Sequence, residues 1–192
     1  MAGLGYSVFD TGIGRCGIAW GDHGIVSVHL PEAREIETRR RVLRQYPDAR
    51  ELRPPLNTEI AIEGIVALLR GQPSNLSDVT LDMHGITPFH RRVYEFARTI
   101  PRGETLTFTE FAGRLRLPGA VHSVGQAITR NPFTIIVPCH RVLAAAGEAD
   151  GVCANGGVVS KRRLLSLEGA LSKSGPTLFD ALLSVAPPRL QG

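Results

Sequence analysis

Residues 135–142 read Ile-Ile-Val-Pro-Cys-His-Arg-Val, an apolar run that ends in a proline, a cysteine and a histidine. Because proline cannot donate a ladder hydrogen bond, we expect the buried run to end at Val137 and to present Cys139 at the mouth of the next segment. A thiolate is a strong nucleophile, and a nearby imidazole such as that of His140 often generates one near neutral pH. The same pair is also compatible with a buried structural cysteine beside a hydrogen-bonded histidine, so the surrounding sequence has to decide.

The segment before this stretch predicts two helices joined by a tight turn. Thr107 or Thr109 can cap a helix that runs to Leu115, residues 117–119 (Leu-Pro-Gly) form the turn, and a helix of small residues follows over 120–129. This order is typical of a helix-turn-helix. Small residues allow the second helix to approach either another helix or a DNA groove, and the spacing alone does not separate these two interpretations.

The N-terminal part predicts a small domain with an antiparallel sheet. Short apolar segments at 6–10, 17–20 and 25–30 are separated by glycine-containing turns, which indicates three strands. Beyond them we expect a polar, arginine-rich helix over 32–46, an apolar helix capped by Thr58 and ended by Gly71, and a short strand over 79–83.

The predicted fold class is α+β, with a mostly helical C-terminal domain that contains the helix-turn-helix. A helix starting at Thr87 and Pro88 precedes the helix-turn-helix, and another over 158–167 follows the cysteine and ends at Gly169. The expected organisation is an N-terminal α+β domain (1–85), a helical domain (86–171) and a C-terminal tail (172–192).

Composition places the chain among globular proteins and indicates a polyanionic partner. Of its 192 residues, 43% are hydrophobic and 21% charged, and the sequence shows neither a signal peptide nor an apolar run that could span a membrane. Residues 1–86 carry 9 Lys+Arg against 11 Asp+Glu, whereas residues 87–171 carry 11 against 6. The basic C-terminal part favours a polyanion such as DNA, although a solvated arginine-rich surface would look the same.

The cysteines and histidines predict neither disulfides nor a metal site. Cys16, Cys139 and Cys153 are an odd number, which suits a reducing compartment such as the cytoplasm or the nucleus. Their spacing does not match a zinc cage, so we expect no metal and no cofactor. Cys16 fits a core position, and Cys153 fits either a small gap-filling side chain or a second site of alkylation or oxidation.

Pro138-Cys139-His140-Arg141-Val142, with Asn131-Pro132 upstream, resembles the active-site signature of the O6-alkylguanine-DNA alkyltransferases, also called methylated-DNA–protein-cysteine methyltransferases. The resemblance covers roughly residues 86–171. It includes Phe89, Val93 and Tyr94, then Ile100-Pro101-x-Gly103-Glu104, and finally Gly156, Gly157, Lys161, Leu164, Leu165, Glu168 and Gly169.

The resemblance implies a suicide enzyme that flips O6-alkylguanine out of duplex DNA and keeps the alkyl group as a thioether on Cys139. It further implies that His140 acts on the thiol through a bridging water, that Glu168 orients this histidine, and that Asn131 braces the turn. The matching DNA-contacting positions are Phe108, Ala120, Val121, His122, Ser123, Arg130 and Arg141, and those of the substrate pocket are Val142, Gly151, Cys153, Gly156 and Gly157. The expected partner is double-stranded DNA containing O6-alkylguanine. We expect the protein to act as a monomer and not to associate with a membrane.

The chain departs from the family on the DNA side while it keeps the thiol relay. His122 stands where the family has an arginine that enters the base stack, Phe108 replaces a tyrosine, and Val121 is bulkier than the usual alanine. The loop 151–157 lacks the tyrosine that is usual in the family. Two other functions therefore remain open, namely a lesion-binding paralogue with weak or absent transfer, and a cysteine hydrolase or redox thiol unrelated to DNA.

Overall fold

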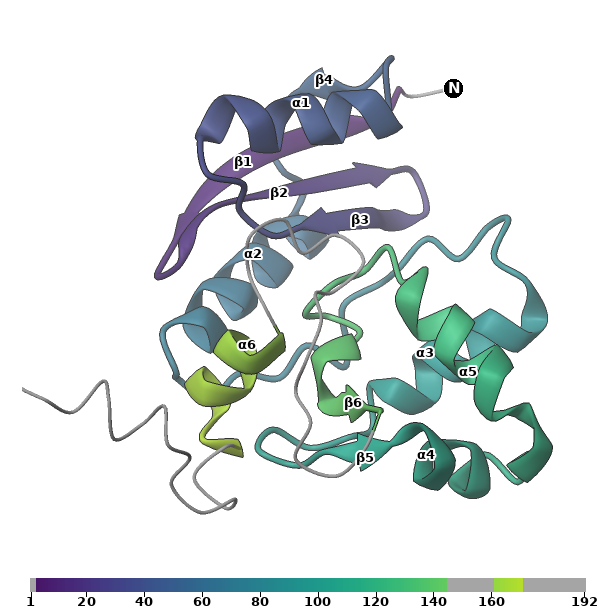
Figure 1. Ribbon diagram of the computed structural model, residues 1–192. Helices are drawn as coiled ribbons and strands as arrows, with labels where there is room; N and C mark the ends of the chain where they lie inside the picture. Colours follow the sequence, from purple (N-terminus) through teal and green to yellow (C-terminus); the bar gives the residue numbers. More distant parts are fainter. Residues whose placement is uncertain (1–2, 145–160, 171–192) are drawn as a thin grey trace, which may run out of the picture.

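The computed structural model describes residues 3–144 and 161–170, which form a sheet flanked by helices and a second, mostly helical part (Figure 1). The sheet has the order β3-β2-β1-β4, in which β1 (Gly5–Thr11), β2 (Gly14–Gly21) and β3 (Gly24–His29) are antiparallel neighbours. These are the three predicted strands. A fourth strand, β4 (Arg50–Glu51), pairs in parallel with β1 and was not expected.

Helices α1 (Glu35–Gln45) and α2 (Leu56–Leu69) pack on opposite faces of this sheet. Alternate residues of β2 explain this arrangement, because Ala19 packs with Val42 of α1, whereas Ile18 joins the larger cluster that contains Ile65 of α2. The prediction that Thr58 caps α2 is wrong. Pro55 occupies the N-cap position, and Thr58 lies buried inside the first turn.

The outer edge of β3 is hydrogen-bonded to two segments that lie far away in the sequence. Ile25 N donates to Thr80 O (3.1 Å), Asp82 N donates to Ile25 O (2.8 Å), and Val28 N donates to Pro132 O (2.9 Å). The strand predicted over 79–83 is therefore only an isolated bridge between Leu81 and Ile25. The segment that leads to Cys139 is thus attached to the N-terminal sheet through main-chain bonds.

The second part contains the expected helices α3 (Pro88–Ala97), α4 (Phe108–Arg114) and α5 (Val121–Thr129) (Figure 1). Thr107, rather than Thr109, caps α4: its Oγ1 accepts from Glu110 N, and the Glu110 carboxylate accepts from Thr107 N. The turn between α4 and α5 includes the short 3-10 helix η1 (Pro118–Ala120). The helix, turn and helix expected from the sequence are all present.

The stretch around Cys139 is buried, but it is not a strand. Ile135 has a left-handed backbone (φ 76°), so the apolar run bends into the core instead of extending. The 3-10 helix η2 (Cys139–Arg141) follows, and then β6 (Val142–Leu143) pairs in parallel with β5 (Leu106–Thr107). Helix α6 (Lys161–Glu168) contacts both η2 and α2, which brings it next to the turn that carries Cys139.

His29 provides a test of the fold through the pH dependence of stability. It is fully buried in β3 and hydrogen-bonded to Ser27, and burial, with a smaller effect of Arg41, lowers its pKa to about 4. An unfolded histidine titrates near pH 6.5, so the neutral ring contributes its full stability above that pH and loses it as the pH falls toward 4. We expect the free energy of unfolding to decrease by about 2–3 kcal/mol over this window.

Urea unfolding between pH 7 and pH 4.5 measures this loss. His29→Gln should flatten the pH dependence of the free energy of unfolding in this window. If the free energy of unfolding of His29→Gln fell with pH as steeply as that of the wild type, other groups would be the cause of the loss of stability. The buried Glu168, whose pKa is about 2, contributes at lower pH, so the two effects fall in different windows.

Candidate active site

Asn131 holds the turn that carries the cysteine. It follows the C-terminal end of α5 and is fully buried. Its Nδ2 donates to Val137 O (2.8 Å), and its Oδ1 accepts from Phe133 N (2.9 Å). The amide side chain therefore bridges two main-chain positions of the loop between α5 and η2, and it fixes Val137 at the end of the apolar run.

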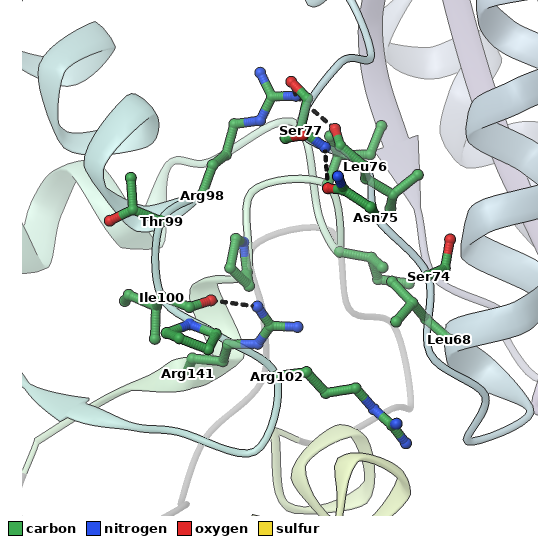
Figure 2. Close-up of a pocket in the computed structure, with 14 residues that line it drawn as sticks. Leu68, Ser74, Asn75, Leu76, Ser77, Arg98, Thr99, Ile100, Arg102 and Arg141 are labelled. Carbon is green, nitrogen blue, oxygen red and sulfur yellow. Dashed lines mark hydrogen bonds between the residues drawn. The ribbon is translucent and has the colours of Figure 1, made fainter.

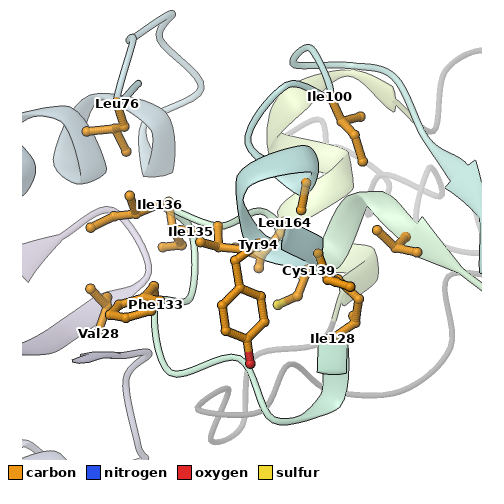
Figure 3. Packing of buried hydrophobic residues seen from close by; sticks show 14 of the residues in the cluster. Val28, Leu76, Tyr94, Ile100, Ile128, Phe133, Ile135, Ile136, Cys139 and Leu164 are labelled. Carbon is orange, nitrogen blue, oxygen red and sulfur yellow. The ribbon is translucent and has the colours of Figure 1, made fainter. Parts of the chain in front are cut away.

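Cys139 is the first residue of η2, and its side chain lies in the apolar interior. The residue is 1% exposed, and Figure 3 shows its sulfur among buried side chains that include Tyr94 and Ile128. Tyr94 donates its hydroxyl to Ala127 O (3.1 Å), and burial, with an additional contribution from Cys139, raises its pKa to about 12. Tyr94 thus connects the surroundings of the Cys139 thiol to α5. The sequence analysis included Tyr94 in the family resemblance but did not predict this contact.

The imidazole of His140 lies next to the carboxylate of Glu168. Its Nε2 donates to Glu168 Oε1 (2.8 Å), and the two side chains are 2% and 5% exposed. Burial by itself lowers the pKa of His140, but the interactions with Cys139 and Glu168 outweigh it, and the net pKa is raised. The Nδ1 atom is also buried, and no described residue is hydrogen-bonded to it. The imidazole can therefore hold a proton between the thiol and the carboxylate.

Arg141 holds Glu168 from the other side. Its Nε and Nη2 donate to the two carboxylate oxygens (3.0 and 2.7 Å), and its Nη1 donates to Ile100 O (2.6 Å). Burial raises the pKa of Glu168, but His140 and Arg141 outweigh it and lower the pKa to about 2. The expected DNA contact by Arg141 does not fit this placement, because the side chain is buried and its donors are engaged. An internal ion pair keeps Glu168 negatively charged.

A groove of about 640 Å³ on the α5 face brings together several predicted DNA-contacting residues. In this groove Gln126 Nε2 donates to His122 Nε2 (3.0 Å). Ala120 ends η1 and Ser123 is exposed on α5. The groove is lined by Phe108, Val121, His122, Gly125, Gln126, Thr129 and Arg130.

Lys161 joins α6 to this groove. Its Nζ lies 5.8 Å from the centre of the Phe108 ring and donates to Val142 O (3.0 Å). Sequence reasoning gave this lysine no role, although it belongs to the family pattern. Val142 itself is buried in β6. The remaining expected pocket positions, Gly151, Cys153, Gly156 and Gly157, lie outside the described residues.

A second cavity, of about 330 Å³, lies beside the turn that carries Cys139 (Figure 2). Ile135, Ile136 and Pro138 form its wall on the side of the turn. On the other side, Arg98 Nη2 donates to three main-chain carbonyls of the segment that follows α2, those of Leu76, Ser77 and Val79. This cavity therefore lies at the junction of the two parts of the chain.

Within residues 3–144 and 161–170, no group of three or more His, Cys, Asp or Glu side chains is placed to hold a metal ion. In the same part of the chain, no helix is long and apolar enough to cross a membrane.

Comparisons with known proteins agree with this geometry. The family model of the 6-O-methylguanine DNA methyltransferase DNA-binding domain matches residues 88–170. A methylated-DNA–protein-cysteine methyltransferase of Methanothermobacter thermautotrophicus is 35% identical over 153 residues, which are 80% of this chain and 78% of that protein. A protein of the same name from Mycobacterium tuberculosis is 42% identical over 120 residues, which are 62% of this chain and 70% of that protein.

The crystal structure of Mycobacterium tuberculosis OGT in complex with DNA is also similar, with a TM-score of 0.66 and 32% identity over 87% of this chain and 94% of that one. The relative from Methanothermobacter thermautotrophicus is more than 30% identical, and the match covers most of both chains. By sequence and by fold, the chain belongs to the family of methylated-DNA–protein-cysteine methyltransferases.

Proposed function

We propose that this protein repairs O6-alkylguanine in duplex DNA by transferring the alkyl group irreversibly to its own Cys139, in a reaction that each molecule performs once. The contact of 2.8 Å between His140 Nε2 and Glu168 Oε1, directly beside the cysteine, carries this proposal. The names of the relatives support the reaction class.

The transfer is a single displacement. The alkylated guanine is flipped out of the duplex, and the proton of the Cys139 thiol passes to His140 through a water molecule. The thiolate attacks the alkyl carbon, a C–S bond forms, and the C–O6 bond breaks with its electron pair moving to the guanine. The guanine leaves after it has gained a proton, and the thioether remains.

The residues around the thiol stabilise this proton transfer. The negative charge of Glu168 favours the imidazolium form of His140, and Arg141 holds the carboxylate in place. Arg141 thus acts as a positioning residue rather than as a DNA contact. Asn131 keeps the turn closed so that Cys139 keeps its place relative to α5.

DNA binding is assigned to the α5 face and to the turn before it. Phe108, His122 and Arg130 line the groove on this face, with Val121 among them and with Ala120 and Ser123 beside it. The wall of the lesion pocket is assigned to Val142, Gly151, Cys153, Gly156 and Gly157. We further infer that the protein acts as a monomer in a reducing compartment, which is the cytoplasm of a bacterial cell or the nucleus of a eukaryotic one. The odd number of cysteines supports this inference.

A lesion-binding paralogue with weak or absent transfer is the second candidate. It is favoured by His122 and Phe108, which replace the arginine and the tyrosine expected at these DNA-handling positions. Retention of Cys139, His140 and Glu168 in one contact network favours transfer instead.

Mass spectrometry of the intact protein separates these candidates. After incubation with a duplex that contains O6-methylguanine, we expect each chain to gain the mass of one methylene group, and fragmentation should place it on the peptide with Cys139. The unmodified duplex is the control and should cause no change. Tight binding of the lesion without a mass change would favour the paralogue and contradict the proposed transfer.

A further inference from the structure

Arg116 occupies a backbone conformation that normally selects glycine. Its φ is 59°, and among residues 3–144 and 161–170 only Ile135 is another non-glycine residue with positive φ. Arg116 N donates to Gly113 O (2.9 Å), and Leu117 N donates to Ala112 O (2.9 Å). This pair of bonds is the Schellman motif that ends many helices, and Arg116 is its left-handed residue.

An arginine is unfavourable at this position. A side chain in the left-handed region crowds the following carbonyl, whereas glycine avoids this penalty. The main-chain bonds of the motif do not require a side chain. Selection for stability alone would therefore favour glycine after α4, and the arginine needs another explanation.

The surroundings of Arg116 suggest an explanation for the arginine. Arg116 lines a groove of about 520 Å³ between α3 and the end of α4. Arg92, Arg114 and Arg116 are exposed arginines of this groove, and Glu95 is the single acidic residue among its described lining residues. Arg92 Nη2 donates to Leu115 O (2.7 Å), so it also braces the residue before Arg116. Glu110 of α4 is engaged in the cap with Thr107.

We propose that this groove binds the phosphate backbone of DNA, and that Arg116 is retained for its charge despite its unfavourable backbone. The inference rests on the proposed DNA repair function. In a helix-turn-helix the first helix and the turn lie across the DNA backbone, and arginines provide contacts that do not depend on sequence. Arg116 lies two residues before η1, which leads into α5, and a phosphate contact there would support a binding helix that has His122 in place of arginine.

Two Arg116 variants with a distant control test this inference. Affinity for a short undamaged duplex is measured by fluorescence anisotropy over a series of KCl concentrations, together with the melting temperature. Arg116→Gly should weaken binding several-fold and reduce the slope of log affinity against log salt by about 1. The same variant should melt about 1–3 °C higher, because glycine relieves the left-handed residue.

Arg116→Lys keeps the charge and should keep the salt slope, with an unchanged melting temperature. Arg53→Ala, an exposed arginine of the N-terminal part, should change neither the slope nor the affinity. If Arg116→Gly kept the wild-type slope of log affinity against log salt, the proposal would be overturned. A lower melting temperature of this variant would also overturn it, because a loss of structure would then explain the weaker binding. Binding of undamaged duplex does not require alkyl transfer. The binding test of Arg116 can therefore give a negative result while the mass-spectrometric test of alkyl transfer gives a positive one, and the reverse also holds.

Discussion

Replacement of Cys139 by alanine should abolish alkyl transfer while binding to the methylated duplex persists. The sulfur is the proposed acceptor of the alkyl group, and alanine offers no nucleophile in its place. We expect no detectable label on the variant after incubation with a duplex that carries a radiolabelled methyl group on guanine O6. Anisotropy with the same duplex measures the retained binding.

Cys16→Ala is the matched control, because Cys16 is also a buried cysteine. It lies in β2, where burial raises the pKa of its thiol to about 12, so it is almost entirely protonated at neutral pH. This variant should accept label as the wild type does. Transfer of label to Cys139→Ala would show that another residue is the acceptor, and Cys153 would then be the first to examine.

Glu168→Gln should slow alkyl transfer by about 10²-fold or more and should also destabilise the fold. The rate falls because the imidazolium of His140 loses its negative partner during deprotonation of the thiol. Stability falls because the guanidinium of Arg141 remains buried without a counter-charge, a situation that costs about 3–5 kcal/mol. Single-turnover kinetics and urea unfolding measure the two effects.

A double variant separates these two consequences. Glu168→Gln combined with Arg141→Met removes both charges, so it should recover part of the stability but not the rate. Glu51→Gln is the control for a partly exposed ion pair, that of Glu51 with Arg39, and should cost less than about 1 kcal/mol. Wild-type kinetics in Glu168→Gln would contradict the role assigned to this carboxylate.

The sequence predicted the elements whose signals are local. Alternating apolar residues and glycine turns located β1, β2 and β3, and a threonine before a proline located the start of α3. Signals that depend on distant partners were missed. The two-residue strand β4 is defined by its pairing with the distant β1, and the segment 79–83 reads as a strand although it makes only one bridge.

The candidate site shows the same division. The resemblance brought Cys139, His140 and Glu168 together, and the structure places the last two in contact across 28 residues of sequence. The resemblance did not indicate that Arg141 turns inward to the same carboxylate. Arginines are usually exposed, and only the tertiary packing against Ile100 and α6 makes an internal position favourable. The bend at Ile135 was missed because β-branched residues favour extended backbone.

The hydrogen bonds along β3 also affect whether copies of this chain can aggregate through the edges of the sheet. A free strand edge is a template for growing aggregates, and both edges of this sheet are partly occupied. On one side, Thr80, Asp82 and Pro132 occupy main-chain groups of β3, and on the other side β4 is only two residues long and both of them are charged. A protein that is consumed by its reaction would accumulate as inactive copies, and a sheet whose edges are partly occupied gives those copies less backbone on which to stack.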